Sequence, residues 1–134
     1  MCIFCEIVKG NIPCYKVYED DTCVAFLDIS QATIGHTLVV PKKHASNIFE
    51  LEEGDAAHIF KVVKALSSKI CKSLGVKDVN ILNNNGSLAG QTVDHFHIHI
   101  IPRYVHDGFD IKFPSNKLEK NEFNDLLNKI KGLK

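Results

Sequence analysis

Apolar and polar positions alternate along this chain with two different periods. From Glu53 to Leu74 the apolar residues recur at helical spacing, and Gly75 follows where a C-terminal cap belongs. A shorter helix is expected at residues 3–8. A further amphipathic helix, with lysines on its outer side, is expected near the C-terminus. Its apolar positions are Phe123, Leu126, Leu127 and Ile130.

Five segments have the composition and alternation of strands, and turn residues bound them. Residues 15–20 and 22–29 predict a hairpin that turns at Asp20 and Asp21. The other expected strands are residues 36–41, residues 78–85 and a histidine-rich strand that stops at Pro102. Strands gathered around one long helix predict an α+β domain with a mostly antiparallel sheet.

The histidine-rich strand has the sequence DHFHIHIIPR, residues 94–103. Because strand side chains alternate between faces, His95, His97 and His99 should share one face, with neighbours about 7 Å apart. Phe96 and Ile98 should point to the opposite face, toward a core. Three imidazoles buried side by side would compete for hydrogen-bond partners, so this row indicates a functional site.

A glycine-bearing loop leads directly into these histidines. Gly86 and Gly90 permit backbone shapes that turn several N–H groups toward one point, which suits an anion such as phosphate. Side-chain donors lie on both sides of the loop, at Asn83, Asn84, Asn85, Gln91 and Thr92. Beside three imidazoles, the loop becomes a candidate phosphoryl-binding site.

Composition narrows the class of protein. A chain of 134 residues suits one domain, and 16 basic against 16 acidic residues give no support for nucleic-acid binding. The N-terminus does not resemble a signal peptide, and there is no apolar run of membrane-spanning length. An odd number of cysteines, five, favours thiols or metal ligands over a disulfide framework. The expectation is a cytoplasmic protein.

Three functions are compatible with the histidine row and its loop. In the first, His97 attacks phosphorus directly and His99 supplies a proton, so that one difficult displacement becomes two easier ones. In the second, His95, His97 and His99 together hold a catalytic metal ion in a phosphohydrolase. In the third, the pocket binds purine nucleotides without catalysis and the protein acts through partners.

The chain resembles the histidine triad (HIT) superfamily, and most closely its Hint and bacterial Hit branch. Three ordered stretches carry the resemblance: FLDISQATIGHTLVVPKKH, NNNGSLAGQTVD and HFHIHII. The similarity runs from Cys2 to about Arg103, so we expect a HIT domain at residues 1–110 and a basic, partly helical extension at residues 111–134. It implies a HIT-like fold and a homodimer in which two five-stranded sheets join.

The resemblance also implies an activity. It is the cleavage of the α-phosphate linkage in purine nucleotide derivatives, either phosphoramidates or dinucleoside polyphosphates, through a covalent nucleoside monophosphate on His97. It implies that His36 stands beside the triad and that Asp28 binds the ribose hydroxyls. Base-pocket walls are implied at Phe4, Ile7, Ile12, Phe26 and Ile29. Phosphate contacts are implied at Asn84, Gln91 and Thr92.

A second constellation points to a metal. Cys2 and Cys5 form a CxxC motif, and a PKKH segment supplies His44. In the zinc-bearing bacterial branch of the HIT family the fourth ligand corresponds to His95, which would complete a closed, structural zinc site. The alternative is that Cys2 and Cys5 are two ordinary thiols near a chain terminus. No organic cofactor is expected.

Overall fold

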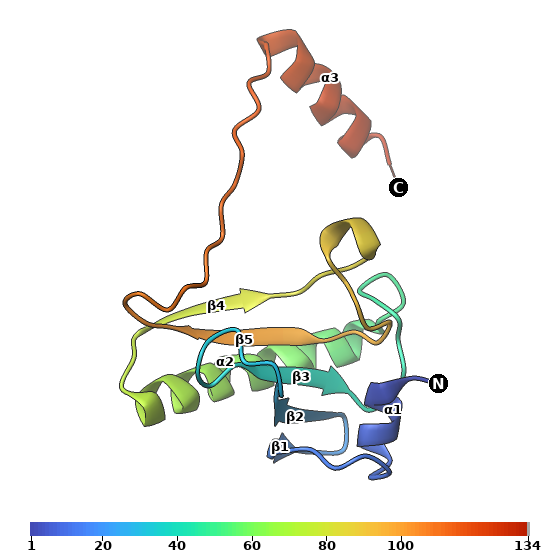
Figure 1. The fold of residues 1–134 in the computed structure, drawn as a ribbon. Helices are drawn as coiled ribbons and strands as arrows, with labels where there is room; N and C mark the ends of the chain where they lie inside the picture. Colours follow the sequence, from blue (N-terminus) through green and yellow to red (C-terminus); the bar gives the residue numbers. More distant parts are fainter. Residues whose placement is uncertain (134) are drawn as a thin grey trace.

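An antiparallel sheet of five strands, in the order β1-β2-β3-β5-β4, forms the centre of the computed structural model, which describes residues 1–133 (Figure 1). The strands are β1 (Lys16–Glu19), β2 (Cys23–Leu27), β3 (Thr37–Pro41), β4 (Asp78–Leu82) and β5 (Ile98–Arg103). The helices are α1 (Ile3–Val8), α2 (Glu53–Leu74) and α3 (Lys120–Lys131), with a short 3-10 turn, η1 (Ser87–Ala89). This confirms the expected fold class and the β1–β2 hairpin.

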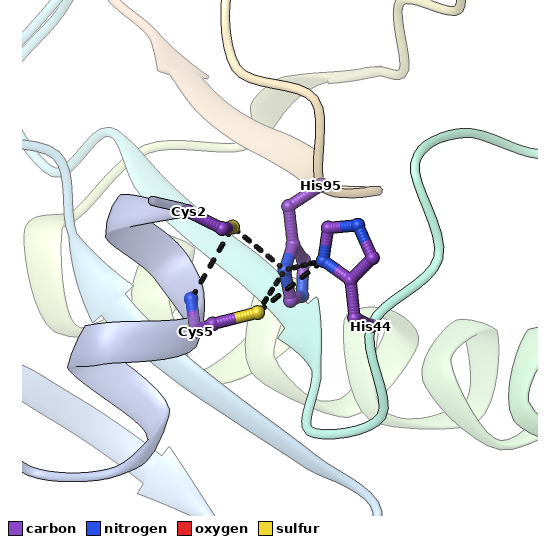
Figure 2. Close-up of side chains that lie close together, drawn as sticks. All are labelled: Cys2, Cys5, His44 and His95. Atoms are coloured by element: carbon purple, nitrogen blue, oxygen red, sulfur yellow. Dashed lines mark hydrogen bonds between the residues drawn. The ribbon is translucent and has the colours of Figure 1, made fainter.

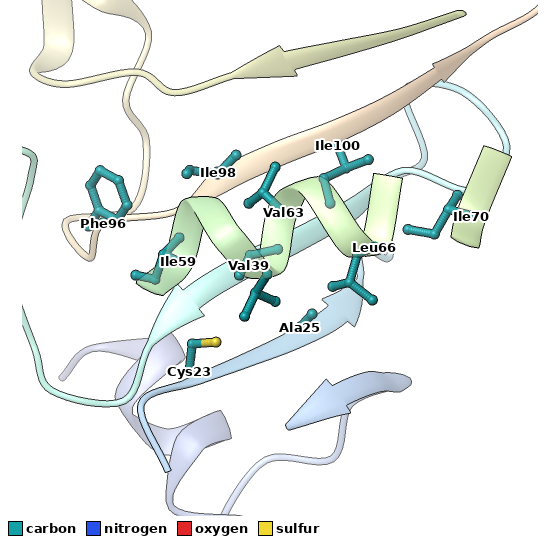
Figure 3. Packing of buried hydrophobic residues seen from close by; sticks show 11 residues of the cluster. Cys23, Ala25, Val39, Ile59, Val63, Leu66, Ile70, Phe96, Ile98 and Ile100 are labelled. Atoms are coloured by element: carbon teal, nitrogen blue, oxygen red, sulfur yellow. The ribbon is translucent and has the colours of Figure 1, made fainter. Parts of the chain in front are cut away.

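The long helix α2 covers one face of the sheet. It ends as predicted at Gly75, whose left-handed φ of 70° lets its N–H reach back to carbonyl groups of the last turn. Its apolar stripe packs on inward-facing strand residues to form the main core (Figure 3). The core residues are Cys23, Ala25, Val39, Ile59, Val62, Val63, Leu66, Ile70, Phe96, Ile98 and Ile100. Among residues 1–133, no helix is both long enough and apolar enough to span a membrane.

The opposite face of the sheet carries a smaller apolar cluster under α1. Phe4 of α1 packs with Phe26 at a ring-centroid distance of 5.6 Å, and Leu38 and Val40 complete the contact. His99 pairs with Leu38 in the β3–β5 register. The α1 face is therefore the face on which the histidine row lies.

The histidine strand differs from its predicted bounds at both ends. β5 begins only at Ile98, because the backbone before it bonds to loops: Phe96 N–H donates to Ala45 O, and His97 O accepts from the Asn83 side chain. It also continues through Pro102, which pairs only with β4. At that position no β3 neighbour needs the N–H that proline lacks.

The C-terminal helix α3 forms at the expected place but does not pack on the sheet. Residues 112–119 lead away from the end of β5 as an extended arm, and α3 stands beyond the free edge of β4 (Figure 1). A reciprocal capping box between Glu119 and Glu122 begins the helix. Its whole surface, including the apolar face, is exposed.

Candidate active site and metal centre

A cavity of about 380 Å³ opens on the α1 face of the sheet, between α1, β2 and the histidine row. Nine of the residues expected to bind substrate or to react line it: Phe4, Ile7, Ile12, Phe26, Asp28, Ile29, Thr92, His97 and His99. The apolar members come from α1, from β2 and from the residues next to them, whereas Thr92, His97 and His99 lie near the start of β5 and Asp28 follows β2. The cavity therefore has a wall suited to a flat apolar ring and an end suited to a charged group.

The ring of His97 is held in one tautomer. Its Nδ1 lies 2.7 Å from the carbonyl oxygen of His95, and because a carbonyl only accepts, Nδ1 must carry the proton. In the neutral ring Nε2 then keeps its lone pair. Phe4 packs edge-on against the ring at a centroid distance of 5.2 Å and restricts its rotation. His97 is thus a buried imidazole in the wall of the cavity, and the tautomer of its neutral ring has a free Nε2.

His99 receives a hydrogen bond that fixes its proton on the other nitrogen. The backbone N–H of Ala32 donates to Nδ1 of His36, so the neutral His36 ring carries its proton on Nε2. That Nε2 lies 2.9 Å from Nδ1 of His99 and donates to it. His99 therefore carries its own proton on Nε2, while Asp28 lies 3.7 Å from His36 Nε2. Asp28, His36 and His99 thus form a polar cluster beside His97.

Burial keeps the His36 and His99 imidazoles neutral. Burial first, and then repulsion from positive charge on His97 or His36, lowers the pKa of His99 to about 4. Burial likewise lowers the pKa of His36, although the Asp28 carboxylate partly opposes this effect. At neutral pH His99 is a neutral donor next to the nucleophile, with a ring-centroid distance of 4.9 Å to His97.

The glycine loop adopts the backbone conformations that its sequence suggested. Gly86 and Gly90 have φ of 96° and 89°, which disfavours other residues. The side-chain amide of Gln91 holds the loop, donating to Ser46 O and Val93 O and accepting from Gly86 N–H. Asn84 lies against Gly90. Of the expected phosphate contacts, Thr92 lines the cavity, whereas Asn84, Gly90 and Gln91 lie in the adjoining loop.

The four expected metal ligands converge on one point (Figure 2). Nδ1 of His95 lies 3.4 Å from Cys2 Sγ, 3.5 Å from Cys5 Sγ and 3.1 Å from His44 Nδ1. Ligand bonds of 2.0–2.3 Å at tetrahedral angles would separate such atoms by about 3.3–3.8 Å. His95 Nε2 donates to Pro41 O, which directs the Nδ1 lone pair at the cluster. Two thiols and two imidazoles in this arrangement could bind a metal ion.

This geometry does not fit a single metal ion held by the three histidines. Among the described residues, the ligand atom of His95 gathers with the two thiols, and His97 belongs to no cluster able to hold an ion. His99 clusters with Asp28 and His36 instead. The three histidine rings lie on one face of the sheet as expected, but each ring forms its hydrogen bond with a different partner.

Two positioning contacts were not expected from the sequence. Asn83 Nδ2 donates to the backbone oxygen of His97 at 2.9 Å, and Pro41 O holds His95. Tyr15, Pro13 and other residues between α1 and β1 also line the cavity. These contacts join segments more than ten residues apart, so no local pattern in the chain could have revealed them.

Hydrogen-bonded imidazoles beside an apolar cavity are an arrangement suited to a small nucleotide-binding domain, and comparison with known proteins points to the same class. A model of the HIT domain matches residues 9–106, so the chain belongs to the HIT family. Adenosine 5'-monophosphoramidase hnt1 of Schizosaccharomyces pombe is 44% identical over 93% of this chain and 92% of its own length. Adenylylsulfatase HINT3 of Arabidopsis thaliana is 42% identical over 79% of this chain and 54% of its own.

Solved structures confirm the fold. SMU.412c of Streptococcus mutans matches with a TM-score of 0.94 at 44% identity, over 98% of this chain and 83% of its own. A HIT family protein of Bacillus anthracis matches with a TM-score of 0.92 at 47% identity, over 98% of this chain and 95% of its own. A Zn-bound histidine triad family protein of Mycobacterium smegmatis matches with a TM-score of 0.77 at 31% identity, over 98% of this chain and 96% of its own.

Proposed function

We propose that this chain is a nucleotide hydrolase or transferase that works through a covalent nucleotidyl-histidine on His97. The observation that carries the proposal is the hydrogen bond from His97 Nδ1 to His95 O, which leaves Nε2 free in the cavity wall. The hydrolase class is supported by relatives whose names state the hydrolysis of adenosine phosphoramidate and of adenylyl sulfate.

The proposed reaction has two displacements. His97 Nε2 forms a bond to the α-phosphorus as the bond to the leaving group breaks; His99 Nε2–H donates a hydrogen bond to the leaving group, which takes its proton from solvent water. A second water then attacks the phosphorus, the P–N bond to His97 breaks, and the proton that this water loses passes to solvent. The products are the free leaving group and a nucleoside monophosphate. The leaving group would be an amine, a sulfate or a second nucleotide.

Substrate orientation follows from the two ends of the cavity. Phe4, Phe26 and Ile29 would enclose a purine, and the Asp28 carboxylate would accept hydrogen bonds from ribose hydroxyls. Thr92 and the backbone of the loop at Gly90 would contact the phosphate. Asn84 and Gln91 would hold that loop in place from within it.

We further propose that the Cys2, Cys5, His44 and His95 cluster holds one structural zinc ion. The ligand types and their separations fit a closed tetrahedral site, and such a site has no open position for catalysis. It would fix the backbone oxygen of His95, the atom that sets the tautomer of His97.

The proposed setting is a cytoplasmic homodimer. All five cysteines are free thiols, which agrees with a reducing compartment. The β4 strand is one edge of the sheet, where a second sheet could pair.

Intact-mass spectrometry tests the covalent step. Wild-type protein mixed briefly with adenosine 5'-phosphoramidate, adenylyl sulfate or a dinucleoside polyphosphate should gain the mass of one AMP, and the fastest substrate identifies the leaving group. His97→Ala should show no adduct and at least ~10³-fold slower turnover. His58→Ala, a histidine of α2 outside the cavity, should behave as wild type.

Two results would overturn this function. Nucleotide binding without adduct or turnover would favour the non-catalytic binding protein. Rapid and reversible loss of turnover on adding a chelator, without unfolding and without an adduct, would favour a metal-dependent phosphohydrolase.

A further inference from the structure

A second group of metal-ligand side chains lies on the α2 face of the sheet. Asp20 is in the β1–β2 turn, Cys23 at the start of β2 and His58 in the second turn of α2, and each brings a ligand atom within 4.8 Å of the others. Cys23 points from β2 toward α2 and is fully buried (Figure 3). None of the three lines the proposed nucleotide cavity. We call Asp20, Cys23 and His58 the hairpin cluster.

The Asp20 carboxylate is charged and held in one orientation. Its Oδ1 accepts hydrogen bonds from the backbone N–H groups of Thr22 and Cys23. Its Oδ2 accepts from the Tyr18 hydroxyl at 2.7 Å and from His58 Nε2 at 2.6 Å. Burial alone would raise the pKa of Asp20, but these hydrogen bonds lower it well below its usual range. A fixed negative charge therefore lies beside an imidazole and a thiol.

The Cys23 thiol is neutral in these surroundings. Burial first, and then the negative charge of Asp20, raises the pKa of Cys23 to about 12. A divalent cation would reverse this, because its charge offsets both negative groups and a coordinated thiol is deprotonated. The combination of thiolate, imidazole and carboxylate suits Zn²⁺, whereas Mg²⁺ and Ca²⁺ prefer ligands that are all oxygen.

Small movements would bring the three ligand atoms to the spacing of a tetrahedral ion. Zinc bonds of 2.0–2.3 Å separate neighbouring ligand atoms by about 3.3–3.8 Å, so the pair of Asp20 and His58 would open from 2.6 Å by about 1 Å. The His58 side chain is 37% exposed on α2 and is free to make this movement. A cavity of about 210 Å³ beside its ring has room for a water as fourth ligand. The residues that line this cavity are Tyr18, His58, Lys61, Val62, Ala65 and Leu66.

We propose that the hairpin cluster is a second zinc site, with Asp20, Cys23 and His58 as ligands and a water in the fourth position. On binding, the zinc ion takes the place of the proton on His58 Nε2, the ring gains a proton on Nδ1, and the Cys23 thiol proton passes to solvent. The metal fastens the β1–β2 turn to α2. With three protein ligands that are less closely gathered than those of the four-ligand cluster, the site binds more weakly and fills only when metal is added. The inference does not depend on the hydrolase activity.

Cobalt titration tests this site, because Co²⁺ enters tetrahedral zinc sites and a thiolate bound to it gives a charge-transfer absorption band. Equilibrium dialysis of the wild type against increasing Co²⁺ should show one binding step that His58→Ala shifts to at least ~10-fold higher Co²⁺ concentration. Any step that belongs to the four-ligand cluster should be the same in both proteins. The comparison therefore holds whether or not that cluster contains zinc.

Absorption spectra of a second variant identify the thiol. Cys23→Ala should lose the charge-transfer band that accompanies this step. The matched control is Cys71→Ala, which removes another buried thiol that belongs to no ligand cluster within residues 1–133 and should keep both the step and the band. Lys61→Ala, which changes the same small cavity, should bind Co²⁺ at no higher concentration than the wild type. A wild type without the step, or a step unchanged in His58→Ala, would overturn the proposal even if Cys23→Ala does not fold.

Discussion

Three histidines of one short segment have different roles because each ring has a different hydrogen-bond partner. His95 gives its Nε2 proton to Pro41 O and turns Nδ1 toward the thiols. His97 gives its Nδ1 proton to a carbonyl and leaves Nε2 free in the cavity. His99 accepts from His36 and keeps a proton on Nε2. The identity of the residue is the same in each case, and the neighbouring acceptor decides the chemistry.

The buried state of His99 predicts a pH dependence of stability. In the folded chain its pKa is about 4, whereas an unfolded histidine has a pKa of about 6.5. As pH falls below about 6.5 the unfolded state binds the proton first, so the free energy of unfolding should decrease between about pH 6.5 and pH 4. Above about pH 6.5 His99 is neutral in both states, and its contribution to the free energy of unfolding is fully present.

Urea unfolding at several pH values measures this effect. His99→Gln should reduce the slope of unfolding free energy against pH by up to one proton, about 1.4 kcal/mol per pH unit. The slope should not vanish, because burial also lowers the pKa of His36. An unchanged slope in the variant would mean that His99 is not the group that titrates.

At the scale of single elements, α2 does most to position the site, although it contributes no residue to the cavity. Its stripe of Ile59, Val63, Leu66 and Ile70 holds the side of β5 opposite to His99. Because strand side chains alternate, burial of Ile98 and Ile100 under α2 forces the histidine between them to the α1 face.

Replacing a glycine by alanine should have opposite effects on stability at Gly54, within α2, and at Gly75, its C-terminal cap. Gly75 has φ of 70°, where a side chain is strained, so Gly75→Ala should lower the free energy of unfolding by about 1 kcal/mol. Gly54 lies within the first turn of α2, and a Cβ there would meet no atom within 4 Å. Gly54→Ala should leave stability unchanged or raise it by up to about 1 kcal/mol. Chemical denaturation of the matched pair checks both, and a more stable Gly75→Ala would contradict the cap.

At the scale of the whole molecule, the Cys/His cluster joins three distant parts of the chain. Cys2 caps α1 and Cys5 lies within it, His44 comes from the loop after β3, and His95 from the segment before β5. A metal ion at this point would link the wall of the cavity to the sheet. Its binding free energy would add directly to the stability of the fold.

Metal content tests this link. Protein prepared without chelator should contain about one zinc per chain, the occupancy of a single four-ligand site. Cys5→Ser should lose the zinc and unfold at a lower temperature, because one thiolate ligand is missing. Cys14→Ser changes a thiol that belongs to no cluster of ligands within residues 1–133 and should keep the zinc. Elemental analysis and thermal unfolding distinguish the two, and a wild type without zinc would refute the assignment.

Local periodicity in the sequence was enough to predict α2, its cap at Gly75, the β1–β2 hairpin and the shared face of the histidines. These features depend on which side chains lie three, four or two positions apart, and burial of apolar groups then selects the matching geometry. The metal ligands and the pocket residues were expected from the resemblance to the HIT family, because residue patterns alone did not identify them.

Only the tertiary structure decided where each proton lies and what each loop touches. Cys2 meets His95 across 93 positions of the chain, and His36 meets His99 across 63. It also decided that β5 begins at Ile98 and that α3 stands off the sheet. Such contacts depend on how whole elements pack, and the spacing of residues along the chain carries no information about which distant carbonyl or thiol will lie beside a given ring.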